Sequence, residues 1–245
     1  MLSPLSITQN GRSSTLWFDR PESGNTITEA LVEDAHAALD RAEEAGCTAI
    51  ILRGSQTVFC TGADFGGGDP VDPERLYHLW ERLALGPFVS LSVVEGQATA
   101  GGIGFVAASD MVLAGPDARF TLPELLFGLH PACVLPFLTR RIGAHAASYL
   151  TLSTQSINAE QALSLHLVDS ILPEIELGLA QHIRRIERLD PQAIRRFKAY
   201  RADLDKSLGQ SRDKAIAENR SLFGDSSIRA NLQRYATEQK FPWEL

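Results

Sequence analysis

The 245-residue sequence has few of the residues that mark a secreted or membrane-spanning protein. Its three cysteines, Cys47, Cys60 and Cys133, are widely spaced and form no CxxC pair, so no disulfide framework is indicated. No stretch approaches the ~18 consecutive apolar residues of a membrane span, and the N-terminus lacks a basic region followed by an apolar one. These absences predict a protein of a reducing compartment, the cytoplasm, with no membrane attachment.

Basic residues are also in the minority. The chain has 23 Lys and Arg and 30 Asp and Glu, so its formal net charge is -7. A negative global field repels polyphosphates and argues against a nucleic acid as partner. The arginines concentrate in the second half of the chain, chiefly over residues 184–201. Such a run fits a solvated helix face, and it also fits contact with an acidic carrier or a phosphorylated cofactor arm.

Hydrophobic residues make up 44% of the chain and charged residues 22%, which is typical of a packed globular fold. Apolar periodicity predicts strands at 5–8, 15–18, 49–52, 89–94, 111–114 and 119–121. It predicts helices at 30–45, 73–85, 96–108, 132–142, 144–152, 159–165, 174–189, 191–203 and 211–222. Strands alternating with helices, followed by helices alone, predict an α/β core over residues 1–190 and a helical region over residues 191–245.

Two segments rich in small residues follow predicted strands. The first is FCTGADF at residues 59–65, and the second is EGQATAGGIG at residues 95–104. Small residues let the backbone approach a ligand closely, and the free N–H groups at the start of a helix form an anion site. Glycines after strands also fit turns or tight packing, so each segment alone leaves both interpretations open.

Together, at this separation, the two segments resemble the paired oxyanion-hole segments of the crotonase (enoyl-CoA hydratase/isomerase) superfamily. The resemblance extends to the opening strands, to Leu122-Pro123-Glu124 and to residues 156–169. It implies a crotonase-like β-β-α spiral core, with a C-terminal α-helical region that forms a homotrimer or hexamer. It also implies that the backbone N–H groups of Ala63 and Gly101, flanked by Gly62 and Gly102, hold a thioester oxygen as it becomes an enolate.

Hydratases of this superfamily use two glutamates as acid and base, and the match places them at Glu124 and at Gly104. The second position is therefore a glycine, which departs from a two-glutamate addition of water. The apolar neighbours of Glu124 predict a pKa raised by desolvation, as general acid–base catalysis near neutral pH requires. Glu124 also fits a carboxylate in the first turn of a helix, where the helix dipole favours it.

A narrower resemblance involves residues 122–138, the most specific stretch, and the terminal residues 240–244. They look like the dehydratases of polyketide β-branching cassettes, which convert 3-hydroxy-3-methylglutaryl-carrier protein to 3-methylglutaconyl-carrier protein. The decarboxylase of such cassettes is thought to use a lysine near the first oxyanion segment, and residues 63–94 contain none. The alternatives are a generic enoyl-CoA hydratase or isomerase, that decarboxylase, and a non-catalytic carrier-binding protein.

The resemblance implies an acyl carrier protein as partner. It implies no metal and no cofactor beyond the phosphopantetheine arm or CoA that carries the substrate. The distal carboxylate of a glutaryl substrate needs a binding partner, for which Arg82, His78 and His130 are candidates. Arg82 and His78 also fit exposed helix positions, and His130 fits a cap or core role. Asp64 fits either a local Asx-type hydrogen bond or a substrate contact.

Overall fold

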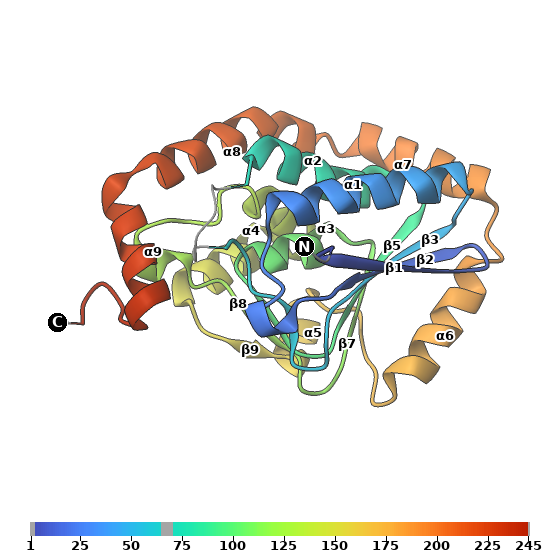
Figure 1. Cartoon of the computed structure of the whole chain (residues 1–245). Helices are drawn as coiled ribbons and strands as arrows, with labels where there is room; N and C mark the ends of the chain where they lie inside the picture. Colours follow the sequence, from blue (N-terminus) through green and yellow to red (C-terminus); the bar gives the residue numbers. More distant parts are fainter. Residues whose placement is uncertain (1–2, 65–70, 245) are drawn as a thin grey trace.

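The computed structural model describes residues 3–64 and 71–244, which form two sheets and their covering helices (Figure 1). A six-stranded sheet has the order β1-β2-β3-β5-β7-β10, and a four-stranded sheet has the order β4-β6-β8-β9. The strands are β1 (Leu5–Asn10), β2 (Ser13–Phe18), β3 (Ala49–Arg53), β4 (Val58–Cys60), β5 (Val89–Val94), β6 (Gln97–Thr99), β7 (Met111–Ala114), β8 (Arg119–Thr121), β9 (Ile157–Asn158) and β10 (Ser170–Ile171).

The helices confirm most of the predicted pattern. They are η1 (Pro21–Ser23), α1 (Glu29–Glu44), α2 (Pro73–Leu85), α3 (Gly101–Ala108), η2 (Glu124–Phe127), α4 (Leu135–Ser153), α5 (Ala159–Ser164), α6 (Ile175–Ile186), α7 (Pro191–Leu204), α8 (Ser207–Gly224) and α9 (Ser226–Glu238). The helix expected over residues 96–108 is wrong in its first part, because residues 97–99 form β6 and α3 begins only at Gly101. No helix was expected over the residues of α9.

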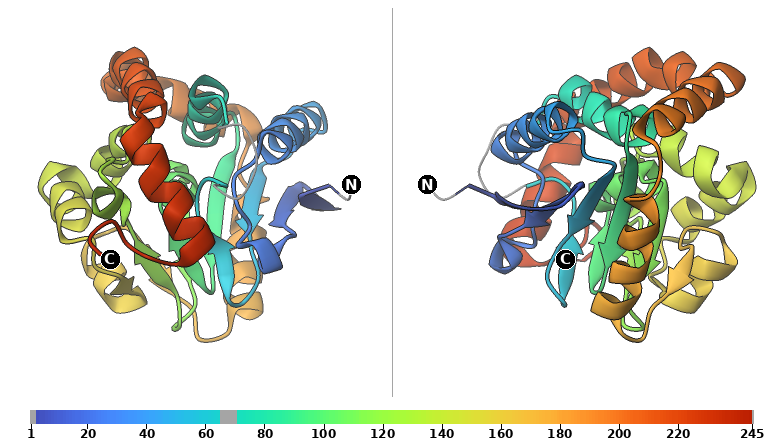
Figure 2. Two further views of the ribbon diagram at one scale, coloured as in Figure 1. Left: turned by 60° about the vertical axis from the view of Figure 1, so that its left-hand side comes forward. Right: turned by 90° about the vertical axis from the view of Figure 1, so that its right-hand side faces the viewer.

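Side chains of β3 alternate between the two faces of the large sheet, as the strand period requires. Ile50 and Leu52 are buried in the same cluster as the apolar side chains of α1 and α2. Ala49 and Ile51 pack in a second cluster that includes Leu179 of α6. Helices α1 and α2 thus cover one face of the sheet and α6 the other (Figures 1 and 2).

Helix termini follow local sequence signals. The Thr28 side chain accepts a hydrogen bond from the Leu31 N–H and begins α1, while the Asp72 side chain accepts one from the Glu74 N–H at the start of α2. Gly143 has a φ of 81° and divides α4 into two helical parts. This agrees with the two helices predicted on either side of it.

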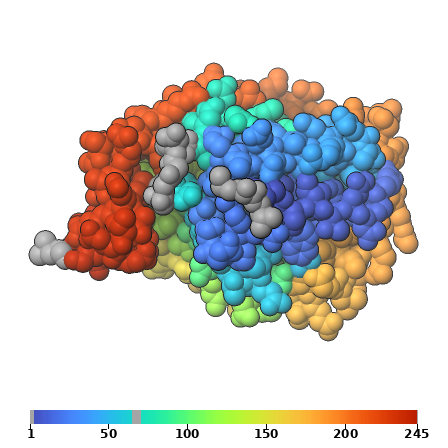
Figure 3. All heavy atoms as spheres, in the orientation of Figure 1, coloured from blue at the N-terminus to red at the C-terminus, as the bar shows by residue number. Residues whose placement is uncertain are grey.

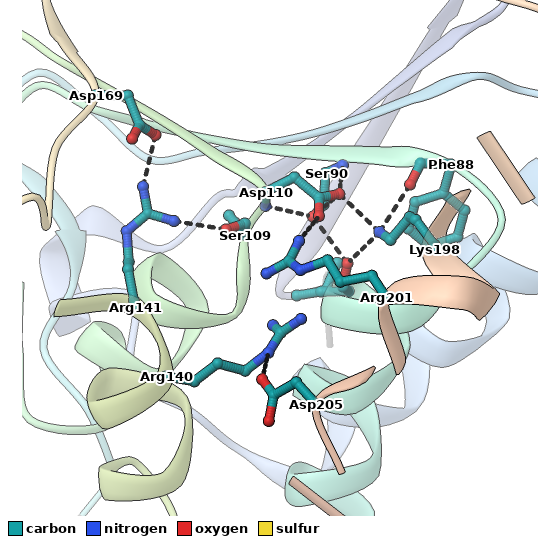
Figure 4. Close-up of polar contacts among 11 residues, drawn as sticks. Phe88, Ser90, Ser109, Asp110, Arg140, Arg141, Asp169, Lys198, Arg201 and Asp205 are labelled. Carbon is teal, nitrogen blue, oxygen red and sulfur yellow. Dashed lines mark hydrogen bonds and ion pairs between the residues drawn. The ribbon is translucent and has the colours of Figure 1, made fainter. Parts of the chain in front are cut away.

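The C-terminal helices dock on the core through buried charges (Figure 4). Lys198 of α7 is 3% exposed and donates to the carbonyls of Leu83 and Phe88 at 3.1 and 2.9 Å. It also forms an ion pair with Asp110 at 2.6 Å. A buried lysine needs such partners, because an unpaired buried charge is strongly unfavourable. Helix α7 therefore packs directly on the core, while the role of residues 191–245 in trimerisation stays a prediction.

Helix α9 forms one end of the molecule, beside η2 (Figure 3). Phe127 and Leu129 pack against Ile228 and Leu232 in a small cluster apart from the main core. The Asn231 side chain donates to the Phe127 carbonyl at 3.2 Å and fixes this contact. Among the described residues, no helix is both long and apolar enough to cross a membrane.

Candidate active site

Three parallel strands of the smaller sheet end side by side. β6 pairs in parallel with β4 on one side and with β8 on the other, where Thr99 lies opposite Thr121. Because parallel strands share their direction, the residues that follow them meet at one edge of the sheet, where α/β proteins commonly bind ligands. The first candidate donor, Ala63, follows β4, the second, Gly101, follows β6, and Glu124 follows β8. The topology therefore gathers the three predicted catalytic residues.

The two oxyanion segments lie in contact. A Cβ atom on Gly62 would lie 3.0 Å from the Gly101 nitrogen and 2.8 Å from the Ala100 Cβ, so only a glycine allows this approach. Gly62 also has a φ of +93°. Within residues 3–64 and 71–244, neither the Ala63 nor the Gly101 N–H donates a backbone hydrogen bond. Two N–H groups on adjoining segments thus have no backbone acceptor among the described residues, which fits the predicted oxyanion hole.

Ala100 holds the second donor in a strained conformation. Its φ of 52° and ψ of -123° lie in a region that residues with a side chain rarely adopt. The Ala100 N–H donates to the Thr121 carbonyl at 3.0 Å, which fixes the turn between β6 and α3. Strain of this kind concentrates at functional sites, where the surrounding structure maintains it. No local pattern of residues predicted this conformation.

Asn25 supports the first segment and was not among the predicted site residues. Its buried side chain donates to the carbonyls of Val58 and Phe59, both at 3.1 Å, and accepts from the Arg20 N–H at 2.8 Å. Its φ of 50° is one that asparagine tolerates better than most residues. The hydrogen bonds hold β4 in place, and with it the segment that leads to Ala63.

Gly102 and Asp64, two other predicted site residues, lie beside these donors. A Cβ on Gly102 would overlap the carbonyl of Cys60, so Gly102 allows α3 to pack closely on β4. Asp64 is exposed. Substrate contacts by either residue stay predictions. The glycine-rich stretch at 65–70, including Phe65 of the first segment, lies outside the described residues.

Glu124 has the environment of a proton-exchanging group. It begins η2 with 7% of its surface exposed, and its Oε2 atom has no hydrogen-bond partner among the described residues. Burial raises the pKa of Glu124 from 4.5 to about 7, opposed only in part by a hydrogen bond with its own backbone. The carboxyl therefore populates both protonation states near neutral pH, as general acid–base catalysis needs.

This raised pKa predicts that Glu124 makes stability depend on pH. Below pH 4.5 the carboxyl is protonated in both folded and unfolded chains; between pH 4.5 and about 7 mainly the unfolded chain ionises. The Glu124 contribution to the free energy of unfolding should therefore fall by about 3 kcal/mol over this range and stay constant above it. Denaturant unfolding of wild type and Glu124→Gln across this range measures the difference. A difference that does not change with pH would contradict the raised pKa.

Gly104, where the family pattern has a glutamate, faces the indole of Trp80. A Cβ atom on Gly104 would lie 2.5 Å from Trp80 Cε2 and closer still to Cζ2. Trp80 of α2 is 1% exposed and packs edge-on against Phe105 and Phe137, with ring centroids 5.8 Å apart in each case. The indole thus fills the space that a side chain at position 104 would enter. Trp80 was not among the predicted site residues.

Arg82 and His78 both turn toward α1. Arg82 Nη2 forms ion pairs with Asp40 and Glu43 at 2.7 and 2.8 Å, and its side chain is 17% exposed. His78 is exposed and stacks on His36 with ring centroids 5.4 Å apart. These contacts give both residues a role in packing α2 on α1. Binding of a distal carboxylate by either one stays a prediction.

The third candidate, His130, lies on the segment after η2. Its Nε2 atom is 3.6 Å from Glu218 Oε1 of α8, and its side chain is 36% exposed. His130 is therefore in the same segment as Glu124 but already has a carboxylate neighbour. Its binding of a second carboxylate stays a prediction.

Substitution of Arg82 by alanine separates packing from substrate binding. Because the Asp40 and Glu43 side chains that pair with Arg82 are partly exposed, we expect Arg82→Ala to lower the free energy of unfolding by about 1 kcal/mol. A role in binding the distal carboxylate predicts a further loss of turnover with a glutaryl-type substrate that an uncharged acyl substrate does not show, as steady-state kinetics on both would measure. Equal changes on both substrates would instead leave Arg82 with the packing role alone.

Two sheets with parallel strands, their covering helices and a helical C-terminal region make up a crotonase fold. Residues 13–245 match the family model described as enoyl-CoA hydratase/isomerase. The chain belongs to this family, and it is an enzyme of the hydratase and dehydratase type.

Several known proteins are similar over most of the chain. Bacillaene synthase dehydratase PksH of Bacillus subtilis (strain 168) is 39% identical over 236 residues, which are 93% of this chain and 91% of that protein. The 2,3-dehydroadipyl-CoA hydratase of Escherichia coli (strain K12) is 29% identical over 238 residues, with 91% and 89% covered. A Bacillus subtilis structure described as a polyketide biosynthesis enoyl-CoA hydratase is 37% identical with a TM-score of 0.93, and 97% and 98% of the two chains are covered.

Proposed function

We propose that this protein dehydrates 3-hydroxy-3-methylglutaryl-carrier protein to 3-methylglutaconyl-carrier protein in polyketide β-branching. The observation that carries the proposal is the buried and unpaired carboxyl of Glu124, which follows the strand next to the one that leads to Gly101, together with a glycine, Gly104, where the family pattern has a second glutamate. The similarity to a polyketide dehydratase over 93% of the chain supports the same reaction class. A generic two-glutamate hydration fits this site less well.

The mechanism needs one proton-exchanging group. The Ala63 and Gly101 N–H groups hold the thioester oxygen while the ionised Glu124 takes the α-proton, so the electron pair of the C–H bond moves into the enolate. The protonated Glu124 then gives that proton to the β-hydroxyl, which leaves as water while the α,β double bond forms. Glu124 is regenerated as a carboxylate. A pKa of about 7 suits both steps.

The substrate arrives on a phosphopantetheine arm of an acyl carrier protein, with CoA as the alternative, and the enzyme acts in the cytoplasm as a homotrimer or hexamer. Support for a reducing compartment comes from the cysteines, since Cys47, Cys60 and Cys133 are all buried and free. Support for an acidic carrier comes from the exposed arginines of the run at 184–201, which stand out on a chain of net charge -7.

A turnover assay tests the proposal. Purified protein is given 3-hydroxy-3-methylglutaryl-carrier protein, the same acyl group on CoA, and 3-hydroxybutyryl-CoA, and loss of water is followed by mass spectrometry. We expect the carrier-bound glutaryl substrate to react fastest. Faster reaction of 3-hydroxybutyryl-CoA would indicate a generic hydratase, and loss of carbon dioxide from 3-methylglutaconyl-carrier protein would indicate the decarboxylase. No turnover of any substrate would leave the carrier-binding role.

A further inference from the structure

The indole nitrogen of Trp80 is a buried donor without a partner. Tryptophan has one polar side-chain atom, Nε1, which donates and cannot accept. In Trp80 this atom is inaccessible to water and donates to no described residue. Arg53 and Arg140 also have one unpaired buried nitrogen each, but both form ion pairs through another nitrogen. For Trp80 the whole hydrogen-bonding capacity is unused, which native structures rarely tolerate without a reason.

Trp80 of α2 packs against the face of α3 that carries Gly104, close to the second predicted donor, Gly101. Gly101 and Gly104 are three residues apart, so they face the same side of the helix and are separated by about 4.5 Å along its axis. A Cβ on Gly104 would lie 2.5 Å from Trp80 Cε2, the carbon that carries Nε1. The indole therefore packs against α3 about one helical turn along the helix from Gly101.

A separation of about one helical turn suits the length of acyl chain between the thioester oxygen and the β-hydroxyl. A thioester oxygen at the Gly101 N–H places the β-carbon two atoms further along the acyl chain, and the β-hydroxyl is attached there. Glu124, whose Oε2 is the other unpaired atom of this region, follows β8 beside the strand that leads to Gly101. An unpaired donor on α2 and an unpaired carboxyl oxygen on η2 thus flank the segment that carries Gly101. Both atoms are closed to water, so a bound acyl chain must displace the side chains around them.

We propose that the Trp80 indole N–H binds the β-oxygen of the substrate and positions it for protonation by Glu124. The inference rests on the proposed function, because it needs a substrate with a β-hydroxyl. It makes Trp80 of α2 a substrate-binding residue. The indole occupies the space next to Gly104 of α3, which has no side chain of its own. It also predicts selectivity, since an acyl chain without the β-oxygen would leave the indole N–H unpaired.

The test uses two ligands that differ only in the hydroxyl, 3-hydroxy-3-methylglutaryl-pantetheine amide and 3-methylglutaryl-pantetheine amide. An amide acidifies its α-proton less than a thioester, so neither ligand should react. Nitrogen-15 NMR follows the indole N–H signals of the three tryptophans, assigned with single Trp→Phe variants. The Trp80 proton signal should move downfield only with the hydroxylated ligand, while Trp17 and Trp243 serve as internal controls.

Affinity provides a second readout. The hydroxylated ligand should bind about tenfold more tightly to wild type, and this advantage should vanish in Trp80→Phe and persist in Trp17→Phe. Equal responses of Trp80 to both ligands, with the Gly101 amide signal perturbed, would overturn this inference and leave the proposed function standing. Failure of both ligands to perturb the Gly101 amide would instead count against the proposed function.

Discussion

Glu124→Gln should reduce turnover of 3-hydroxy-3-methylglutaryl-carrier protein by about 100- to 10,000-fold, the usual effect of removing a general acid–base group. The amide has nearly the shape of the carboxyl but exchanges no proton at neutral pH. Glu124 is 7% exposed and its Oε2 has no partner among the described residues, so the substitution can replace an oxygen that forms no hydrogen bond there. Steady-state kinetics should show the loss in kcat rather than in KM, because the change affects proton transfer more than binding.

Glu81 of α2 provides a matched control for this substitution. It is a buried glutamate of similar exposure, 8%, but its carboxylate forms an ion pair with Arg212 of α8. Glu81→Gln should therefore lower stability and leave turnover per folded molecule near that of wild type. Wild-type turnover in Glu124→Gln would remove Glu124 from the mechanism, and an equal loss in both variants would point to a general effect of buried glutamine.

Much of the fold follows from periodicity alone. The predicted helix at 73–85 and the predicted strand at 89–94 have the same bounds as α2 and β5, because both carry strong apolar patterns and α2 has a clear N-terminal cap. Helix α9 was missed because only Ile228 and Leu232 of its side chains are buried, so its apolar stripe is narrow. The start of α3 was misplaced because Ala100 takes a positive φ that no local propensity indicates.

The residues of the candidate site also divide into those that the sequence predicted and those that it did not. Ala63, Gly101 and Glu124 could be predicted because each lies in a family pattern, and the parallel pairing of β4, β6 and β8 places the segments that carry them at one edge of the sheet. Of these three strands, only β8 was predicted from periodicity. The contact between Gly104 and Trp80 could not, since it joins α3 to α2 through tertiary packing. The same holds for Arg82, whose carboxylate partners lie on α1. Patterns along the chain locate backbone-based chemistry better than side-chain partners.

Gly101→Val should reduce kcat/KM by about 100- to 1,000-fold, the usual effect of losing one oxyanion donor. A Cβ at this position would lie 2.8 Å from Ile27 Cδ1 and 3.5 Å from Gly62 Cα, in the contact between the two oxyanion segments. The two methyl groups of valine would occupy space next to the N–H that the thioester oxygen must reach. Glu124 stays in place, so the variant tests the donor separately from the proton-exchanging group.

The control for this variant is Gly209→Val in α8, where a Cβ would meet no atom within 4 Å. Both substitutions place a β-branched residue in the first turn of a helix, so they share any cost in helix propensity. Circular dichroism and unfolding curves then show whether each variant is folded before kinetics are compared. We expect Gly209→Val to keep wild-type turnover. If folded Gly101→Val also kept it, together with its affinity for a pantetheine thioester, the second oxyanion donor would have to be sought elsewhere.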